Sequence, residues 1–375
     1  MIVHVGNYDP NALDGVSTTI VGQCDALLKK GVEIEVWYFV LGVDDIQRKT
    51  APNGLQIFSI PRFRNPLVAA LALPRISKRW ISERISKVEL FHLHSVFSPP
   101  NNRVSRLGIP YVVTPNGGWG EQVLRGRNAV FKSLWIRIFE KSLWRDSKFI
   151  QGVSRLEASS LESLPEIGKI VYIPNGVDVP AATALFKTRE SQNYWLFLGR
   201  LAIEQKGLDI LLNAYAKANL TVSLPSLLLV GPDFRGGMAK LKALAGDLGI
   251  ASKVKFAGPL VGGEKKQVLA QAALFLHPSR WEGLPLSILE ALAHGVPCLV
   301  SPETGVADWI LDNQCGWSVA GDVDLLAASL VGLAQSPVLI REKSINTRIA
   351  VERDFSWNSV ADNLLGAYRS LGGFE

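Results

Sequence analysis

The stretch HPSRWEGLPLSILEALAHGVPCLV, residues 277–300, decides the fold. It predicts the end of a strand, a loop, a helix over Leu286–His294, a turn and a further strand over Cys298–Val300. Pro285 suits the first turn of that helix, where its missing N–H costs nothing. A strand joined to the next strand through a helix is the repeating unit of parallel α/β sheets.

The same alternation continues in both directions from this stretch. In the first half, strands are expected at Ile2–Val5, Glu33–Val40, Gln56–Ile60, Leu90–His94, Tyr111–Thr114, Phe149–Val153 and Ile170–Ile173. In the second half, they are expected at Tyr194–Leu198, Leu227–Val230, Val254–Ala257, Ala273–His277, Cys298–Val300 and Gly316–Val319. Most are continuous apolar runs, which is typical of strands buried on both faces.

The expected fold class is therefore α/β, with two Rossmann-like, doubly wound domains that face each other across a cleft. Ligands of such folds bind at the carboxyl ends of the strands. The first domain is expected over 1–180 and the second over 181–357. The linker is expected near Val179–Gln192, where the hydrophobic periodicity is weak.

Length and composition limit the class of protein. The 375 residues suit two domains, and a hydrophobic fraction of 47% excludes wholesale disorder. No apolar run approaches the roughly 18–20 residues of a membrane span, and no signal peptide is expected. Three widely spaced cysteines, Cys24, Cys298 and Cys315, favour neither a disulfide framework nor a zinc site, so a cytoplasmic location is expected.

The net charge of +6 lies in the first half of the chain. Residues 1–180 hold 22 Lys and Arg against 16 Asp and Glu, whereas the rest of the chain is balanced. The excess is concentrated in Pro61–Lys87 and Val123–Lys148, which argues against a uniformly basic nucleic-acid binder. An anionic partner is expected for the first half alone.

Two helices in these basic segments have apolar faces. Arg75–Lys87 places Ile76, Trp80, Ile81 and Ile85 on one face, which suits either an anionic membrane surface or packing on its own sheet. Asn128–Trp144 places Phe131, Trp135, Ile138 and Phe139 at helical spacing, and a core position is favoured over a groove for an acceptor.

Two segments of the second half carry the candidate chemistry. The N–H groups near Gly283–Leu286 start a helix and suit a diphosphate. Glu282 and Glu290 flank them and suit sugar or ribose hydroxyls. Considered alone, the two glutamates would be interpreted as a carboxylate that complements the helix dipole and a solvated helix residue. The order of the surrounding strand, loop and helix favours a role in binding hydroxyls instead. In LGRLAIEQKGLD, residues 198–209, Arg200 and Lys206 can clamp and neutralise a diphosphate without a metal, although two surface cations are the simpler alternative.

Other familiar motifs are missing from the sequence. It has no GxGxxG after the first strand, no GxxxxGK[ST] and no GxSxG, so these nucleotide-binding and hydrolase classes are not supported. Its one DxD, Asp322-Val323-Asp324, is expected to cap a helix over Leu325–Leu333 rather than to bind a metal.

These motifs resemble the retaining glycosyltransferases of family 4, which have the two-domain GT-B fold. The family's two glutamates separated by seven residues match Glu282 and Glu290, and its GRL…KG motif matches Gly199–Leu201 and Lys206-Gly207. IPNGVD at 173–178 and Phe355-Ser356-Trp357 also resemble the family. After the latter, the resemblance implies that a helix over about 358–375 crosses back to the first domain. The resemblance is specific in residues 170–320 and loose before them.

The resemblance implies a role for each matching residue. Arg200 and Lys206 would hold the donor diphosphate as it leaves, Glu282 would contact the transferred sugar and Glu290 would bind the ribose. The backbone of Gly283, Leu284 and Pro285 would line the phosphate and the sugar, and Leu260 would contact the base through its backbone. The nucleotide diphosphate sugar is a co-substrate, and no metal or other cofactor is expected.

The first half matches the family less closely. Asp14 replaces the first glycine of a loop near the diphosphate, and Gly15 keeps the second. His94 matches a histidine near the donor sugar, with a capped strand end as the alternative. His92 and His94 are expected to point to opposite faces of their strand, and so not to share a metal. Residues 114–118 resemble an acceptor-side loop, which makes Asn116 and Gly117 candidates.

The predicted activity is retaining, metal-independent transfer of a hexose from a nucleotide diphosphate sugar, UDP-sugar first and GDP-sugar next. The acceptor implied is a sugar or lipid-linked saccharide in cell-surface polysaccharide or lipopolysaccharide assembly, with a peripheral place at the inner membrane face. Without an obvious carboxylate nucleophile near His94, front-face displacement is favoured over a covalent intermediate. A GT-B-type sugar-nucleotide epimerase or hydrolase, and a catalytically silent nucleotide-sugar-binding protein, stay open as alternatives.

Overall fold

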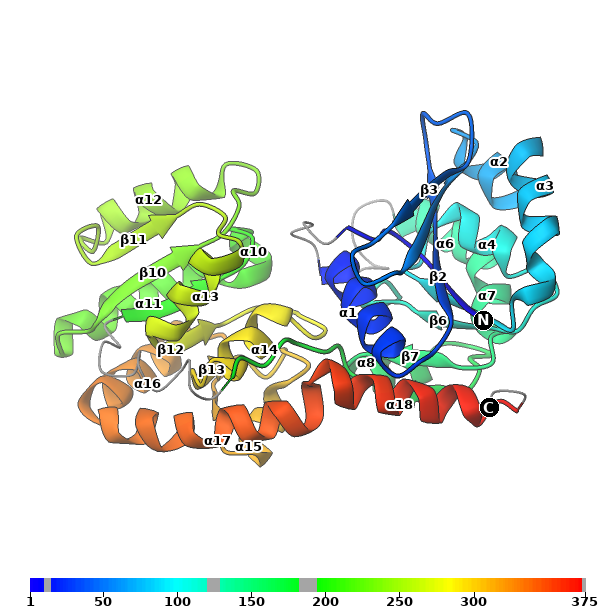
Figure 1. The fold of residues 1–375 in the computed structure, drawn as a ribbon. Helices are drawn as coiled ribbons and strands as arrows, with labels where there is room; N and C mark the ends of the chain where they lie inside the picture. The colour runs from blue at the N-terminus through cyan, green and yellow to red at the C-terminus, as the bar shows by residue number, and fades with distance from the viewer. Residues whose placement is uncertain (10–14, 120–128, 182–193, 373–375) are drawn as a thin grey trace. The chain divides into compact units, whose positions relative to one another are not determined.

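The computed structural model describes residues 1–9, 15–119, 129–181 and 194–372 (Figure 1). The chain divides into two compact units. The first unit holds Met1–Gly176 and Trp357–Glu375, and the second holds Val177–Ser356. The first break lies four residues before the expected boundary at 180, and the return lies at Trp357 rather than at residue 358. Most of the expected linker lies outside the described residues.

The first unit is built on an eight-stranded sheet of order β3-β4-β2-β1-β5-β6-β7-β8. Its strands are β1 Ile2–Val5, β2 Ile34–Val40, β3 Gln47–Thr50, β4 Gln56–Pro61, β5 Leu90–His94, β6 Tyr111–Thr114, β7 Ile150–Gly152 and β8 Ile170–Tyr172. Every neighbouring pair is parallel except β3 and β4. The carboxyl ends of β1, β2, β4 and β5 therefore meet at one edge of the sheet.

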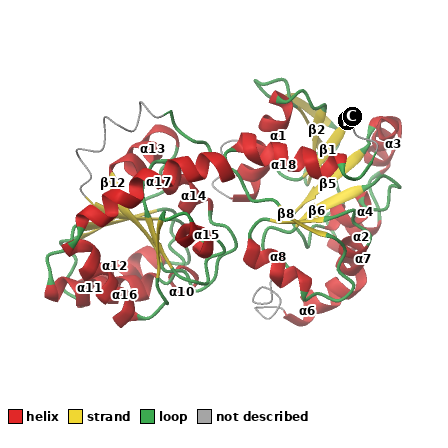
Figure 2. Cartoon of the chain, turned by 90° about the horizontal axis from the view of Figure 1, so that it is seen from below, coloured by secondary structure: helices red, strands yellow, loops and turns green. Residues whose placement is uncertain are grey.

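Helices cover both faces of this sheet (Figure 2). They are α1 Gly15–Lys29, α2 Pro66–Leu71, α3 Arg75–Arg84, η1 Ile85–Lys87, α4 Pro99–Val104, α6 Ala129–Trp135, η2 Ile136–Glu140, α7 Lys141–Arg145, α8 Arg155–Glu162 and α18 Trp357–Arg369. On one face α1 and α18 pack in the same core. A Cβ on Gly22 or Gly176 would lie 2.1–2.2 Å from the indole of Trp357, so both positions need glycine for α18 to dock.

The helix α3 packs on its own sheet. Ile81 is buried, and the Trp80 ring lies 5.1 Å from Trp37 and 4.8 Å from Phe58. The basic side chains at 75, 78, 79 and 87 are left exposed, as is Ile76 at 39%. Of the two interpretations of this helix, packing on the sheet accounts for most of its apolar face.

The helix from α6 to α7 corrects the expectation of a core position. Phe131 is 80% exposed and Ile138 is 51% exposed, together with Val130 at 84% and Leu134 at 56%. The turn η2 is a π-helix, which inserts an extra residue into the helical repeat. Its last two residues, Phe139 and Glu140, are buried, so the apolar pattern is divided between the core and the surface.

The second unit contains a six-stranded, fully parallel sheet of order β11-β10-β9-β12-β13-β14. Its strands are β9 Tyr194–Leu198, β10 Ser226–Val230, β11 Val254–Ala257, β12 Ala272–His277, β13 Cys298–Val300 and β14 Gly316–Ser318. Its helices are α10 Ile203–Lys206, α11 Leu208–Thr221, α12 Gly237–Asp247, α13 Gly262–Gln271, α14 Leu286–Ala293, α15 Ala307–Asp312, α16 Val323–Gln335 and α17 Pro337–Phe355. The prediction of two Rossmann-like α/β units is confirmed.

Two sequence predictions in this unit have clear outcomes. Asp322 is the N-cap of α16, where its carboxylate accepts from the N–H groups of Asp324 and Leu325 at 2.9 Å each, so the helix-cap prediction is confirmed. Pro285 is not in the first turn of α14 but is its N-cap residue, with extended backbone.

No single helix in the described part of the chain is long and apolar enough to cross a bilayer. Two helices joined by a bend of 93°, Val323–Gln335 and Pro337–Phe355, together have the length and composition of a membrane span.

Candidate donor and acceptor sites

The loops after β9 and β12 bring a cation and a carboxylate together in the second unit. The Nζ of Lys206, at the end of α10, forms an ion pair with Oε1 of Glu282, and both side chains are almost buried. The side chain of Gln205 donates to the same oxygen at 3.1 Å. Lys206 and Gln205 lie 76 and 77 positions before Glu282 in the sequence. They meet because parallel strands deliver their following loops to one edge of the sheet.

Gly207 holds this arrangement in place. It adopts left-handed backbone with φ +61°, and a Cβ there would lie 2.0 Å from the carbonyl oxygen of Pro278. Arg280 fixes the same two loops, because its guanidinium binds both carboxylate oxygens of Asp209 at 2.9 and 2.7 Å. Its backbone N–H also donates to the carbonyl of Gln205 at 2.9 Å. The glycine of the KG pair is therefore required by close packing of backbone on backbone.

Arg200 is the exposed cation of the site. It follows the turn at Gly199, and its guanidinium carbon lies 5.3 Å from the centre of the Phe234 ring. Within the described part of the chain it has no carboxylate partner. An exposed guanidinium beside an aromatic ring can accept a phosphate without first breaking an ion pair.

The loop before α14 is accessible and fixed. Glu282 forms an isolated bridge with Thr304, and its backbone N–H donates to the carbonyl of Glu303 at 3.2 Å. A Cβ on Gly283 would meet nothing within 4 Å, so ligand can approach the backbone there. Leu284 and Pro285, which follow Gly283 in the same loop, are buried. This places the start of an eight-residue helix beside the Lys206–Glu282 pair.

Glu290, in the middle of α14, is held by a lysine that the sequence prediction missed. Lys265 of α13 binds its Oε1 at 2.6 Å. Burial raises the pKa of the Glu290 carboxyl, and Lys265 opposes that shift. Leu260 is half-buried in the loop between β11 and α13. Lys265 follows a strand end by eight residues, and its helical position opposite α14 could not be inferred without the sheet order.

The first unit has a pocket of about 390 Å³ at the carboxyl edge of its sheet. It is lined by Val5, Gly6, Asn7, Val16, Ser17, Tyr38, Phe39, Arg62, His94, Ser95, Ser98, Pro99, Pro100 and Asn101. We call it the carboxyl-edge pocket. A Cβ on Gly6 would lie 2.6 Å from Cδ1 of Ile20 and 3.2 Å from the Cβ of His94, so a side chain where β1 ends would require these two residues to shift.

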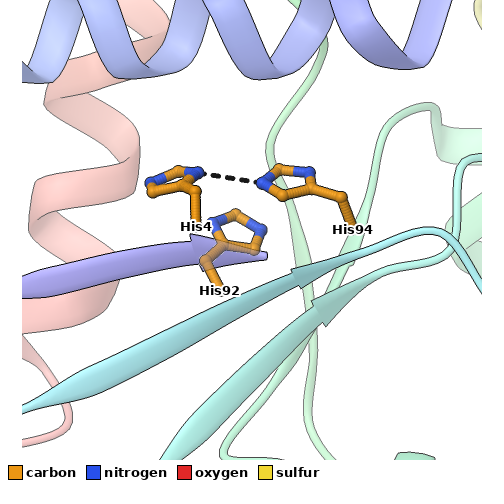
Figure 3. Close-up of side chains that lie close together, drawn as sticks. All are labelled: His4, His92 and His94. Atoms are coloured by element: carbon orange, nitrogen blue, oxygen red, sulfur yellow. Dashed lines mark hydrogen bonds between the residues drawn. The ribbon is translucent and has the colours of Figure 1, made fainter. Parts of the chain in front are cut away.

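Three buried histidines lie beside this pocket (Figure 3). Nδ1 of His4 and Nε2 of His94 are 2.9 Å apart, and the rings of His92 and His94 stack at 4.2 Å. The prediction that His92 and His94 point to opposite faces is wrong, because residues two apart in a strand share a face. His4 joins them because the parallel register of β1 and β5 pairs it with His92.

The ligand atoms of the three histidines all lie within 4.8 Å of one another. Both ring nitrogens of His92, however, are already hydrogen-bonded, to Tyr368 and to Thr114, at 2.6 Å each. Burial lowers the pKa of His4 to about 3 and lowers the pKa values of the other two as well. The three imidazoles are therefore neutral and serve here as a packed, hydrogen-bonded cluster.

The other first-unit candidates lie around the pocket rather than in its wall. Asn116 and Gly117 form a turn after β6 with left-handed backbone, and the Gly117 N–H donates to Glu157. Neither lines the carboxyl-edge pocket. Gly15 starts α1, one residue before Val16 of the pocket wall, and Asp14 lies outside the described residues.

Sequence analysis missed two residues of this region. Arg62 directly follows β4, so the rule that parallel strands end at one edge could have found it. Glu140 is buried, and its carboxylate accepts from the backbone N–H of Phe97 and the indoles of Trp119 and Trp135 at 2.9–3.1 Å. In the sequence, Glu140 could have been identified as the one acidic residue in the basic and aromatic segment 128–144. It fixes the loop between β5 and α4, which lines the pocket.

Two family models match the chain and together span most of it. Residues 13–180 match the model described as Glycosyltransferase Family 4. Residues 192–336 match the model described as Glycosyl transferases group 1.

Curated relatives carry glycosyltransferase names. Phosphatidyl-myo-inositol mannosyltransferase of Mycobacterium leprae is 26% identical over 308 residues, which cover 78% of this chain and 76% of the relative. MMP alpha-(1->4)-mannosyltransferase of Mycolicibacterium hassiacum is 32% identical over 201 residues, covering 52% of this chain and 47% of the relative.

Solved structures of other proteins share the fold. Sucrose-phosphate synthase from Thermosynechococcus elongatus superimposes with a TM-score of 0.78 at 18% identity, covering 99% of this chain and 98% of that one. Anabaena Alr3699/HepE in complex with UDP and glucose gives a TM-score of 0.74 at 15% identity, covering 99% and 100%.

Proposed function

We propose that this chain, which belongs to the family 4 glycosyltransferases and has the GT-B fold, moves a hexose from a nucleotide diphosphate sugar to an acceptor hydroxyl with retention of anomeric configuration. The observation that carries the proposal is the group of residues at the carboxyl edge of the second sheet. Arg200, Lys206 and the start of α14 supply positive charge there, and Glu282 lies among them. The proposed donor is a UDP-sugar, with a GDP-sugar next.

The donor site works by exchange of partners. In the structure, Lys206 forms an ion pair with Glu282. A diphosphate that binds Arg200 competes for Lys206, because the diphosphate of a nucleotide sugar carries two negative charges and a carboxylate carries one. Glu282 is then released toward the hydroxyls of the transferred sugar. Glu290 binds the ribose, Leu260 contacts the base through its backbone, and the backbone of Gly283–Pro285 lines the phosphate and sugar.

The transfer step needs only these groups and the acceptor. The bond between the sugar C1 and the diphosphate oxygen breaks, and its electron pair stays on the phosphate. The acceptor oxygen bonds C1 on the same face, and its proton passes to the leaving phosphate. Arg200 and Lys206 stabilise the charge that develops on the diphosphate. The two cations take the place that a divalent metal would otherwise fill, so EDTA should leave turnover unchanged.

The acceptor binds the first unit, in the carboxyl-edge pocket. His94 lies in the pocket wall and is proposed to face the reacting sugar. The turn at Asn116 and Gly117 is proposed to contact the distal part of a saccharide or lipid-linked saccharide. The lipid-linked class is supported by the name of the relative from Mycobacterium leprae, and its place in cell-surface polysaccharide or lipopolysaccharide assembly is part of this proposal.

The first unit is also proposed to bind an anionic membrane surface at the inner face of the membrane. The helix α6 exposes Val130, Phe131 and Leu134, and basic side chains follow at 137 in η2 and at 141 and 145 in α7. Exposed apolar residues beside cations favour a lipid surface. Phe131→Ser should lower binding to phosphatidylglycerol vesicles and Leu220→Ser, which removes an equally exposed leucine from α11, should not. Equal losses would remove this part of the proposal.

The experiment for the donor site is a thermal-shift panel of UDP, GDP, ADP and their sugar conjugates, with and without EDTA. A ligand that binds only the folded chain raises the melting temperature by mass action. One nucleotide class should stabilise the wild type and an Arg341→Ala surface control, but not Arg200→Ala. Response to none of them would contradict the proposal. Conversion of the sugar nucleotide that persists undiminished with every acceptor would instead favour an epimerase or hydrolase.

A further inference from the structure

The carboxyl-edge pocket contains one unexplained cation. Among the described residues of its wall, Arg62 is the only charged side chain, and no acidic residue is present. His94 adds no charge, because burial and the neighbouring His4 lower its pKa. The pocket volume of about 390 Å³ lies in the range of small-molecule sites.

The position of Arg62 is set by the sheet. Its backbone N–H donates to the carbonyl of Val40 at 3.0 Å, which continues the β2–β4 ladder by one residue. The guanidinium makes one long contact, 3.4 Å from Nη1 to the carbonyl of Phe63, and has no carboxylate partner in the described ranges. Arg62 is half-buried as a residue and lines a pocket without acids among its described residues, which suits an anionic ligand.

The rest of the wall is uncharged and mixes polar with apolar side chains. It carries hydroxyls and amides from Asn7, Ser17, Tyr38, Ser95, Ser98 and Asn101. Nδ1 of His94 is buried and has no hydrogen-bond partner among the described atoms. A buried polar atom left unpaired costs free energy that a ligand hydroxyl or a bridging water can recover. The pocket therefore has a polar, uncharged part near His94 and a cationic part at Arg62.

We infer that the carboxyl-edge pocket takes a polyhydroxylated ring that carries one phosphate, with the ring hydroxyls near His94 and the phosphate bound by Arg62. This inference rests on the proposed function, because it names the chemical class of its acceptor. The planar fork of arginine matches phosphate oxygens in pairs. The same chemistry occurs in a free sugar or cyclitol phosphate and in a phosphoinositide-type lipid headgroup, so the test must separate these sources.

The test uses matched soluble probes and the full chain. Saturation-transfer NMR compares glucose 6-phosphate with glucose, and myo-inositol 1-phosphate with myo-inositol. At least one phosphorylated member should bind more tightly than its neutral partner. Arg62→Ala should weaken that binding by about 10- to 100-fold, the usual effect of losing a charged hydrogen-bonded pair. Arg64→Ala, two residues further on and exposed, is the matched control and should bind as wild type. Arg62→Lys should recover part of the loss, since it keeps the charge without the fork.

A second arm separates the two sources of phosphate. Vesicles containing phosphatidylinositol that displace the soluble probe from the wild-type chain would identify the headgroup as the ligand, whereas a probe that these vesicles leave bound would identify the free phosphate. Nucleotide binding is measured on the same preparations. Neutral and phosphorylated probes that bind equally, no binding by any probe, or equal effects of Arg62→Ala and Arg64→Ala would overturn the inference. If nucleotides still bind in those cases, the proposed function stands; if they do not, it fails separately.

Discussion

Replacing Gly207 with alanine should destabilise the second unit through two separable effects. Left-handed backbone at a residue with a Cβ costs about 1–2 kcal/mol. The new Cβ would also lie 2.0 Å from the carbonyl oxygen of Pro278, a backbone atom that cannot rotate away. Overpacking of this kind costs about 1–3 kcal/mol more. The expected loss of unfolding free energy is therefore about 2–5 kcal/mol.

Gly236→Ala is the matched control. Gly236 has a similar φ of +74°, but a Cβ there would meet nothing within 4 Å. Its cost should be only the conformational part, about 1–2 kcal/mol. Both variants lie in the second unit, so urea unfolding followed by circular dichroism compares them directly. Equal destabilisation would refute the close-packing argument. Gly207→Ala should also weaken nucleotide binding, because Lys206 precedes it, whereas Gly236→Ala should not.

Three further outcomes follow. Lys206→Met should weaken UDP or GDP binding, measured by calorimetry, by about 10- to 100-fold. Glu282→Gln should leave that binding unchanged or make it tighter, and should slow turnover. Equal losses of nucleotide affinity in the two variants would contradict the exchange of partners. Burial lowers the pKa of His4 to about 3, so the unfolded chain takes up the proton first, and the contribution of His4 to stability should fall by about 1.4 kcal/mol per pH unit as pH drops from about 6.5 toward 3. His92 and His94, whose pKa values burial also lowers, should add to this loss in the same direction. Unfolding free energies that stay constant between about pH 7 and 5.5 would contradict the neutral cluster. Glu140→Ala should raise the acceptor KM without changing nucleotide binding, because the alanine leaves the Phe97 N–H and two indoles without the carboxylate that holds the pocket loop. Glu140→Gln should restore part of the loss. An effect on nucleotide binding alone would argue against this positioning role.

The buried parallel strands were predictable because they are continuous apolar runs. Their expected bounds differ from those in the structure by at most one residue at each end. The strand β3 was missed, since its sequence QRKT is exposed at all four positions and has no apolar face. Its pairing is set by the neighbouring strand β4 rather than by its own composition.

The two candidate sites differ in how much the sequence reveals. Glu282 and the start of α14 lie in one short segment, so local order was enough to associate them. The histidine cluster and Arg62 depend on the order and register of strands that are distant in sequence. The exposed face of α6 could not be distinguished from a core face, because periodicity shows which residues share a side but not what covers it.

The most direct measurement follows the anomeric proton of the donor during turnover by NMR. With an α-linked nucleotide sugar and an accepted acceptor, or slow transfer to water, the account predicts that the first product signal is the α anomer, in EDTA as well as in its absence. Glu282→Gln should slow its appearance, and Arg341→Ala should not. A β anomer appearing first, or turnover that requires an added divalent metal, would contradict retaining transfer from a donor held by Arg200 and Lys206.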